Sequence, residues 1–212
     1  MADLQKIADN LFKGKAKEVK DLVEAALQEN VPVCQILNEG LIAGMIHLGT
    51  KFKNNEVYVP EVLVAARAMK SGMEVLKPLF TQSGIEPIAT VVIGTVKGDL
   101  HDIGKNLVGM MLEGAGFRVL DLGIDVSSDR FIAAVNEYQP QILAMSALLT
   151  TTKISMQSTI AAISQAGLKE KVKILVGGAP VTQRYSIQIG ADGYAPDAGS
   201  AVDKAKQLIG IN

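Results

Sequence analysis

The stretch with the clearest chemistry is segment 98–104, whose sequence is Gly-Asp-Leu-His-Asp-Ile-Gly. An apolar run, 88–96, precedes it and a helical pattern, 104–115, follows it, so a strand-to-helix turn is predicted. Asp99 lies two residues before His101, close enough for its carboxylate to bind Nδ1 and fix the imidazole tautomer. Nε2 is then free either to ligate a metal or to accept a proton, and the turn alone favours neither role.

Two later segments place small or hydroxyl-bearing residues at predicted strand ends. The apolar run 141–147 leads through Ser146 into the hydroxyl-rich segment 150–152, and the run 172–176 ends at the glycine pair 177–178. Because the carboxyl ends of parallel strands form one edge of a sheet, we expect these groups to share a rim with the histidine. At that rim the glycine pair is predicted to clear space for a ligand.

A metal site built from protein ligands alone is disfavoured by the composition. A zinc site needs three or four side chains, whereas the chain has two histidines and a single cysteine, Cys34. The other histidine, His47, falls in a helical pattern far along the chain. An oxygen-rich site from Asp99, Asp102 and Asp125 is an alternative, although it would not need the histidine. A metal bound by one histidine must bring most of its other ligands, as the metal of a macrocycle does.

The spacing of apolar residues divides the chain into two parts. Residues 1–82 show helical spacing throughout, which predicts an antiparallel four-helix bundle, and 83–87 has the composition of a linker. From 88 to 212, five apolar runs alternate with helical patterns, which predicts an α/β domain with a flavodoxin-like (Rossmann-type) parallel sheet of order 2-1-3-4-5. The predicted strands are 88–96, 117–122, 141–147, 172–176 and 193–195. The predicted helices are 4–12, 16–28, 32–51, 60–80, 104–115, 128–138, 152–166, 180–189 and 198–209.

The composition argues against several classes of protein. The net charge is −1 and no basic stripe is present, so nucleic-acid binding is not expected. No apolar stretch approaches the roughly 18 residues of a membrane span, and the start of the chain lacks the pattern of a signal peptide, so a cytoplasmic location is predicted. The glycine spacing matches neither a phosphate-binding loop of nucleotide hydrolases nor Gly-x-Gly-x-x-Gly, which disfavours ATP, GTP and NAD.

Three motifs together resemble the signature of cobalamin-binding domains. In the helical part, Val59-Pro60-Glu61 and the segment 65–69 resemble the cap region of corrinoid proteins in methyl transfer. The resemblance covers nearly the whole chain and is closest to the small corrinoid proteins of methyltransferase systems for methanol, methylamines or aromatic methyl ethers. Cobalamin-dependent methionine synthase contains the same two modules. The three motifs are Asp99-x-His101-x-x-Gly104, Ser146-x-Leu148 and Gly177-Gly178.

The resemblance implies a role for each matching residue. His101 would replace the cofactor's own lower base and bind cobalt from below, Asp99 would hydrogen-bond that histidine, and Thr152 would complete the relay. The displaced nucleotide tail would enter the sheet domain, and the helical part would cap the upper face. The implied cofactor contacts are Gly98, Asp99, His101, Asp102, Ile103, Gly104, Ser146, Leu148, Thr150, Thr152, Gly177 and Gly178, with Tyr58, Val64 and Met69 in the cap.

The resemblance also implies a function. The protein would carry a methyl group on the cobalt of cobalamin or a related corrinoid and would not be a complete enzyme. One partner methyltransferase would load the methyl group, a second would pass it to an acceptor, and a reductive activation protein would restore the cofactor. The alternative is a corrinoid-binding sensor without turnover. A mutase subunit shares the sheet domain but needs no four-helix cap, and a flavodoxin-like domain for another nucleotide is the plainest alternative.

Overall fold

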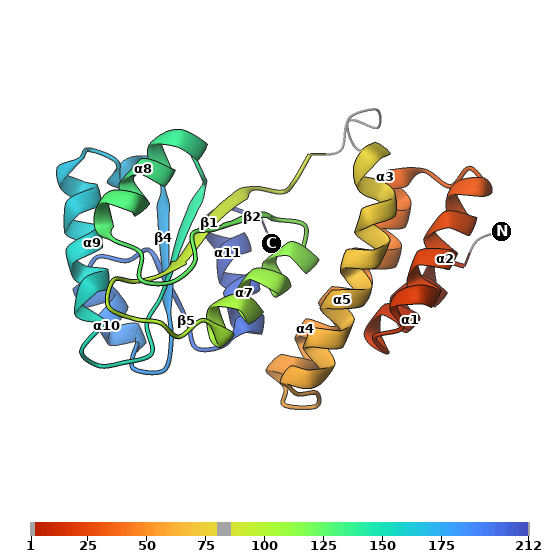
Figure 1. Ribbon diagram of the computed structural model, residues 1–212, viewed down its shortest axis with the longest axis horizontal. Helices are drawn as coiled ribbons and strands as arrows, with labels where there is room; N and C mark the ends of the chain where they lie inside the picture. Colours follow the sequence, from red (N-terminus) through yellow and green to blue (C-terminus); the bar gives the residue numbers. More distant parts are fainter. Residues whose placement is uncertain (1–2, 80–85, 212) are drawn as a thin grey trace. The chain divides into compact units, whose positions relative to one another are not determined.

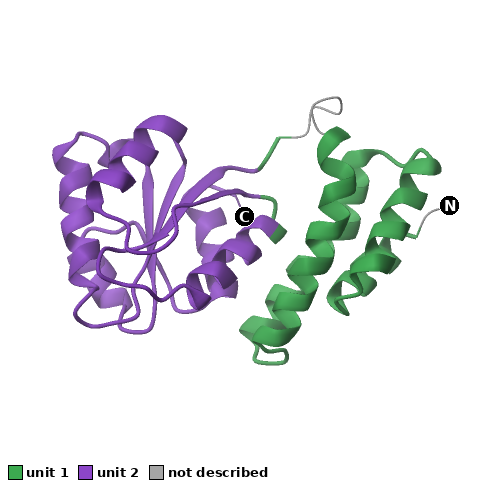
Figure 2. Ribbon diagram, viewed as in Figure 1, with its two compact units in different colours: residues 1–87, 114–116 green, residues 88–113, 117–212 purple. Residues whose placement is uncertain are grey.

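The computed structural model describes residues 3–79 and 86–211 of the chain. Contacts divide the chain into two compact units, which Figure 2 shows in green and purple. The helical unit comprises 1–87 with 114–116, and the sheet unit comprises 88–113 with 117–212. Residues 83–85 of the predicted linker lie outside the described part of the chain. Each unit is therefore considered by itself.

The helical unit follows the predicted apolar pattern, with a change of helix type in its third helix. The predicted helix 32–51 begins as a short α-helical turn, continues as a π-helix and ends as an α-helix. Small residues allow close packing here, because a Cβ on Gly40 would lie 3.2 Å from the Ile7 side chain. Asp3 caps the first helix by accepting the Lys6 N–H. The elements are α1 (Leu4–Phe12), α2 (Ala16–Gln28), α3 (Val33–Gln35), η1 (Ile36–Ile42), α4 (Ala43–Lys53), α5 (Val59–Leu76) and η2 (Lys77–Leu79).

The sheet unit is a doubly wound parallel sheet. Its strand order is β2-β1-β3-β4-β5, which confirms the order predicted from the alternating pattern. Helices α8, α9 and α10 lie on one side of the sheet and α7 and α11 on the other (Figure 1). The strands are β1 (Thr90–Thr95), β2 (Arg118–Asp121), β3 (Ile142–Ser146), β4 (Lys173–Gly177) and β5 (Gly193–Ala195). The other elements are α7 (Ile103–Gly114), α8 (Ser128–Tyr138), α9 (Ile154–Gln165), η3 (Lys169–Lys171), α10 (Gln183–Gln188) and α11 (Ala198–Leu208).

Observed strands and helices begin and end close to their predicted bounds. Strand limits differ by one or two residues at most. The largest difference among the helices of the sheet unit is at α10, which begins at Gln183 and not at 180. The reason is a helix cap: Thr182 has extended backbone, and its Oγ1 accepts the Tyr185 N–H at 3.2 Å.

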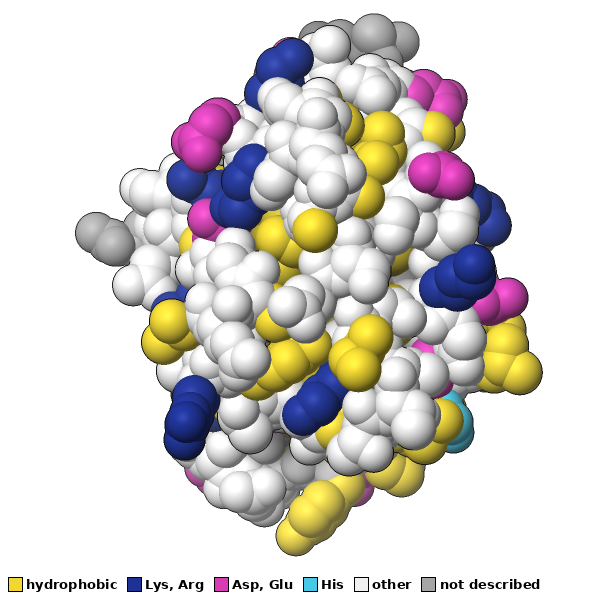
Figure 3. Space-filling view, turned by 90° about the vertical axis from the view of Figure 1, so that its left-hand side faces the viewer, with side chains coloured by type: hydrophobic (Ala, Val, Ile, Leu, Met, Phe, Trp, Pro, Cys, Tyr) yellow, Lys and Arg dark blue, Asp and Glu magenta, His cyan; other side chains and the backbone are white. Residues whose placement is uncertain are grey.

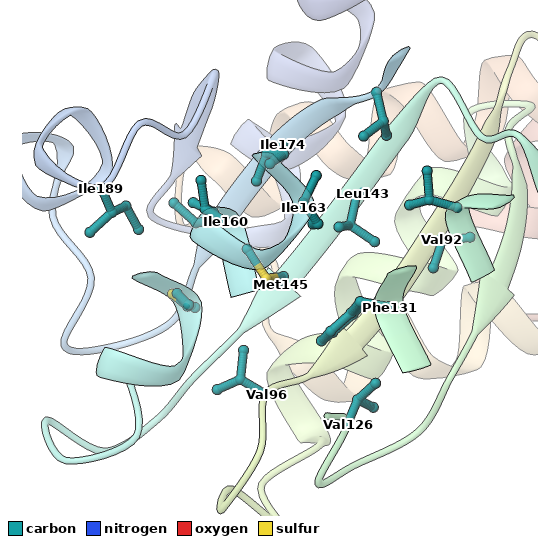
Figure 4. Close-up of a cluster of buried hydrophobic side chains, with 14 of the residues drawn as sticks. Val92, Val96, Val126, Phe131, Leu143, Met145, Ile160, Ile163, Ile174 and Ile189 are labelled. Carbon is teal, nitrogen blue, oxygen red and sulfur yellow. The ribbon is translucent and has the colours of Figure 1, made fainter. Parts of the chain in front are cut away.

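A continuous cluster of buried apolar side chains packs α8, α9 and α10 against one face of the sheet (Figure 4). Phe131 of α8 is fully buried in this cluster, and Val126 and Leu143 are buried with it. The ring lies directly over the middle of β1, where a Cβ on Gly94 would come within 2.9 Å of Phe131 Cζ. The glycine in β1 therefore makes room for the ring, and the two residues together set the distance between α8 and the sheet.

The face drawn in Figure 3 carries charges of both signs. Lys and Arg side chains are scattered over the face in Figure 3 and are interspersed with acidic ones. Among the described residues, no helix combines the length and the apolar character needed to cross a membrane.

The core of the sheet unit leads to a first prediction. Replacing Phe131 by alanine should lower the free energy of unfolding by about 3–5 kcal/mol, because a fully buried ring is lost and a cavity remains. Tyr138→Ala, on the exposed end of the same helix, should change it by only about 0.5 kcal/mol. Urea unfolding followed by circular dichroism measures both. Equal effects of the two substitutions would contradict this account of the core.

Candidate functional site

The sheet brings the three sequence motifs to one edge. In the parallel register Thr95 pairs with Ser146, and Ser146 pairs with Gly177, so the ends of β1, β3 and β4 lie side by side. After β1 the chain runs to α7 on one face, and after β3 it runs to α9 on the other (Figure 1). A crevice-forming switch point of this kind is where doubly wound sheets bind ligands.

The centre of this edge is the carboxylate of Asp99, which is completely buried. Its Oδ1 accepts the backbone N–H of His101 at 3.0 Å and lies 2.7 Å from His101 Nδ1. Its Oδ2 accepts the N–H of Leu148 at 2.7 Å, the hydroxyl of Thr152 at 2.6 Å and, more weakly, the N–H of Leu149 at 3.4 Å. The turn after β1 is thus tied to the turn after β3 through one charged group.

The surroundings of Asp99 decide the protonation of the pair. Burial by itself raises the pKa of Asp99, but hydrogen bonds from Thr152, Leu148 and His101 outweigh it and hold the pKa well below its usual range. Asp99 is therefore ionised at neutral pH and acts only as an acceptor, so His101 Nδ1 carries the proton. Nε2 of the neutral ring then carries a lone pair, and the imidazole is half exposed at the edge of the sheet.

The backbone of the turn is also held in place. Thr95 Oγ1 donates to the His101 carbonyl at 2.9 Å, and the Asp99 N–H donates to the Val96 carbonyl at 3.1 Å. Asp102 is exposed and accepts Asn106 Nδ2 at 3.0 Å across the first turn of α7. These bonds fix the direction of the histidine before any ligand is bound.

Large apolar side chains are exposed in the two turns that meet at Asp99. The exposed fractions are 77% for Ile103, 68% for Leu100, 44% for Leu148 and 43% for Leu149, all within three residues of His101 or in the turn that binds Asp99. Sequence reasoning missed Leu100 and Leu149, although apolar residues beside a polar motif in a turn are a usable signal. An exposed apolar rim around one lone pair suits a broad, apolar ligand that carries a metal.

The glycines of the motifs differ in what they do. Gly178 has φ +117°, and a Cβ on it would lie 2.0 Å from the Ala147 carbonyl oxygen, while a Cβ on Gly177 would lie 2.9 Å from the Ala195 carbonyl oxygen. Backbone contacts of the protein itself therefore account for the missing side chain at both positions, and clearance for a ligand stays a prediction.

Four other predicted contacts in the sheet unit are glycines or residues with a hydroxyl group. Gly98 has φ +84°, which a turn residue without a side chain adopts readily. A Cβ on Gly104 would meet no described atom within 4 Å, so the space beside it is open. Thr150 is exposed, and Ser146 is half-buried at the end of β3.

The three predicted cofactor contacts in the helical unit differ in how exposed their side chains are. Tyr58, which precedes α5, is 64% exposed, and Val64 on α5 is 48% exposed. Met69 is only 5% exposed and is one of the buried residues of α5. Met69 is therefore a core side chain, and the expectation that it touches the cofactor has no support in its position.

The oxygen-rich alternative can be compared with the structure. Within residues 3–79 and 86–211, no three His, Cys, Asp or Glu side chains are grouped to hold a metal ion. Asp125 uses Oδ1 to accept the Gly98 N–H at 2.7 Å, and Asp99 is occupied by its five donors. The site thus fits a metal that arrives with its other ligands, and His101 Nε2 is the protein atom free to reach it.

Comparison with known proteins covers both units. A family model described as "B12 binding domain" matches residues 89–203, and a second with the same description matches residues 3–77. The dimethylamine corrinoid protein of Methanosarcina barkeri is 42% identical over 207 residues, which are 97% of this chain and 97% of that protein.

Two solved structures agree with these matches. A cobalamin-binding protein from Desulfitobacterium hafniense DCB-2 superposes with a TM-score of 0.82 at 30% identity and covers 99% of this chain and 100% of the other. The methanol:cobalamin methyltransferase complex MtaBC of Methanosarcina barkeri gives a TM-score of 0.85 at 30% identity over 97% of this chain and 79% of the other. The resemblance inferred from the motifs is confirmed, and the chain belongs to the family of B12-binding corrinoid proteins of methyltransferase systems.

Proposed function

We propose that the protein is a methyl carrier that binds cobalamin or a related corrinoid, with His101 as the lower ligand of cobalt. When bound, the corrinoid supplies the metal centre that accepts a methyl group and gives it up again. The observation that carries the proposal is the geometry of His101: Nδ1 lies 2.7 Å from a buried, ionised Asp99, and the half-exposed ring presents Nε2 at the ligand edge of the sheet. A corrinoid sensor gains no support from the relatives named above.

Residues of the chain both orient His101 Nε2, the proposed ligand atom, and set its basicity. Asp99 orients the ring and raises the basicity of Nε2, because a carboxylate on Nδ1–H donates electron density to the imidazole. Thr152 and the amide of Leu148 keep Asp99 charged and in place. Whenever Nε2 is not bound to the metal it can hold a proton, and the charge of Asp99 compensates that of the imidazolium.

The remaining roles are proposals that follow from family membership. Helical residues 1–82 act as a cap over the upper face of the cofactor, contacting it through the exposed Tyr58 and Val64, and 83–87 links the cap to domain 88–212. One partner methyltransferase loads the methyl group, a second removes it, and a reductive activation protein restores the cofactor. The dimethylamine relative favours a methylamine as donor over methanol or an aryl ether. The exposed free thiol of Cys34 suits the reducing cytoplasm.

The ligand role of His101 is tested by substitution. Purified protein reconstituted with methylcobalamin should show the absorption of a nitrogen-coordinated corrinoid, and His101→Ala should show the spectrum without a lower nitrogen ligand. His47→Ala is the matched control, because it removes the other histidine of the chain, which lies against Phe12 in the helical unit. A His101→Ala spectrum equal to that of the wild type would exclude His101 as the ligand.

The hydroxyl of Thr152 can be separated from its methyl group. Thr152→Val removes the donor to a buried carboxylate, so it should lower the free energy of unfolding by about 2 kcal/mol and reduce histidine coordination. Thr152→Ser keeps the donor and should cost about 1 kcal/mol or less. Urea unfolding and the methylcobalamin spectrum measure the two effects. If Val and Ser behaved alike, the hydroxyl would not be the important part of the side chain.

The ionisation of Asp99 predicts a dependence of stability on pH. Its pKa is lowered on folding, so the carboxylate contributes stability that is fully present above the unfolded value of about 4 and is lost as pH falls below it. The stability advantage of the wild type over Asp99→Asn should therefore shrink as the pH falls below about 4. Urea unfolding across this range measures it, and a difference unchanged down to pH 3 would contradict the assignment.

A further inference from the structure

A second carboxylate, Asp125, holds the histidine turn from the loop that follows β2. Asp125 Oδ1 accepts the Gly98 N–H at 2.7 Å, and the Asp125 N–H donates to the Asp99 carbonyl at 3.0 Å. The Gly98 N–H belongs to the Lys97–Gly98 peptide, one peptide before that of Asp99, and the Asp99 carbonyl belongs to the peptide that follows Asp99. Asp125 therefore forms hydrogen bonds to the backbone on both sides of the Asp99 Cα, and Asp99 is the residue that orients His101.

Val126, the residue after Asp125, holds Asp125 in place. Val126 is fully buried, and its N–H donates to the Thr95 carbonyl at 2.9 Å. Val126 also forms an isolated parallel bridge with Val96 at the end of β1. Asp125 is thus held next to β1, the strand that leads into the turn. Because Asp125 is held in this way, its two hydrogen bonds can fix the position of the turn.

The backbone of Asp125 is itself unusual. Its φ is +52°, in the left-handed region that residues other than glycine, asparagine and aspartate rarely adopt. Strained or sparsely populated conformations of this kind are concentrated at functional sites. Gly98 is exposed, so water could satisfy its N–H, and a side-chain acceptor is not needed for solvation alone. What the carboxylate adds is a fixed position for the turn.

Other side chains also contact this turn, but each makes a single bond to it. Ser155 Oγ donates to the Lys97 carbonyl at 3.0 Å, and Thr95 Oγ1 donates to the His101 carbonyl. Ser155 binds the same Lys97–Gly98 peptide group as Asp125, but it does not reach the Asp99 carbonyl. Among the described residues outside the turn, Asp125 bonds both the Gly98 N–H and the Asp99 carbonyl.

We propose that Asp125 is a positioning residue for the lower ligand. By bonding the Gly98 N–H and the Asp99 carbonyl, it sets where the Asp99 carboxylate lies and thereby where the His101 imidazole points. The inference rests on the proposed role of His101 as the cobalt ligand, and Asp125 itself touches neither the imidazole nor the metal.

The test uses substitutions that separate the acceptor from the backbone conformation. Asp125→Gly keeps the left-handed backbone but removes the acceptor, whereas Asp125→Asn keeps both a carbonyl acceptor and tolerance of that conformation. Asp125→Ser also loses the acceptor, because its side chain is shorter, but it disfavours the left-handed backbone as well, so an effect is assigned to the acceptor only where the glycine variant shows it too. The matched control is Asp192→Ala, which removes another carboxylate that accepts a backbone N–H at 2.7 Å, that of Ile174, at the opposite edge of the sheet.

Two readouts are compared in the full-length chain. The first is the ¹⁵N spectrum of the His101 ring in the protein without corrinoid, which reports how far the proton is confined to Nδ1. The second is the fraction of histidine-coordinated corrinoid and the affinity for methylcobalamin. Asp125→Gly and Asp125→Ser should mix the tautomers, lower the coordinated fraction and weaken binding about tenfold, the lower end of effects seen for residues behind a metal ligand. Asp125→Asn and Asp192→Ala should match the wild type.

The outcomes separate this inference from the function on which it rests. Glycine and serine variants that match the wild type in both readouts would overturn the role of Asp125. So would an Asp192→Ala protein that loses histidine coordination to the same degree, because the effect would then be one of general stability. If the wild type itself showed no histidine coordination, the ligand role of His101 would fail, and the ring spectrum of the corrinoid-free variants would still decide whether Asp125 positions the imidazole.

Discussion

A buried, ionised carboxylate that must be fully hydrogen-bonded is the constraint on which the ligand edge of this protein depends. Taking the Asp99 charge out of water is costly, and only a complete set of donors offsets that cost. The donors come from its own turn, through His101, and from the turn after β3, through Leu148 and Thr152. Because the two turns follow different strands, the charge is satisfied only when β1 and β3 are neighbours in the correct register.

That dependence explains which parts of the site were predictable. The contact between Asp99 and His101 spans two residues, so its chemistry follows from spacing alone. The strand order followed from the alternation of apolar runs and helical patterns, because a parallel sheet with short connections has few topologies. The hydroxyl-rich segment 150–152 was expected at this rim from the strand pattern, the family resemblance singled out Thr152 for the relay, and the structure places its hydroxyl 2.6 Å from Asp99.

The features that escaped prediction are set by the backbone or by long-range packing. The amides of Leu148 and Leu149 bind Asp99 whatever their side chains are, so residue type gives no signal. Gly178 is required by the Ala147 carbonyl oxygen, which lies at the end of a different strand. The π-helical segment of the third helix likewise has no local pattern that distinguishes it from an α-helix. Each of these depends on a neighbour that is distant in sequence.

The third member of the relay shows how local and distant requirements combine. The Thr152 hydroxyl has one proton and two acceptors within reach, Asp99 Oδ2 at 2.6 Å and the Leu149 carbonyl at 3.0 Å. The shorter distance and the charge favour Asp99. The methyl group, which a serine would lack, lies over Gly98, where even an added Cβ would be 3.7 Å away. A β-branched side chain has few rotamers, so the threonine holds its hydroxyl toward Asp99 with less freedom than a serine would have.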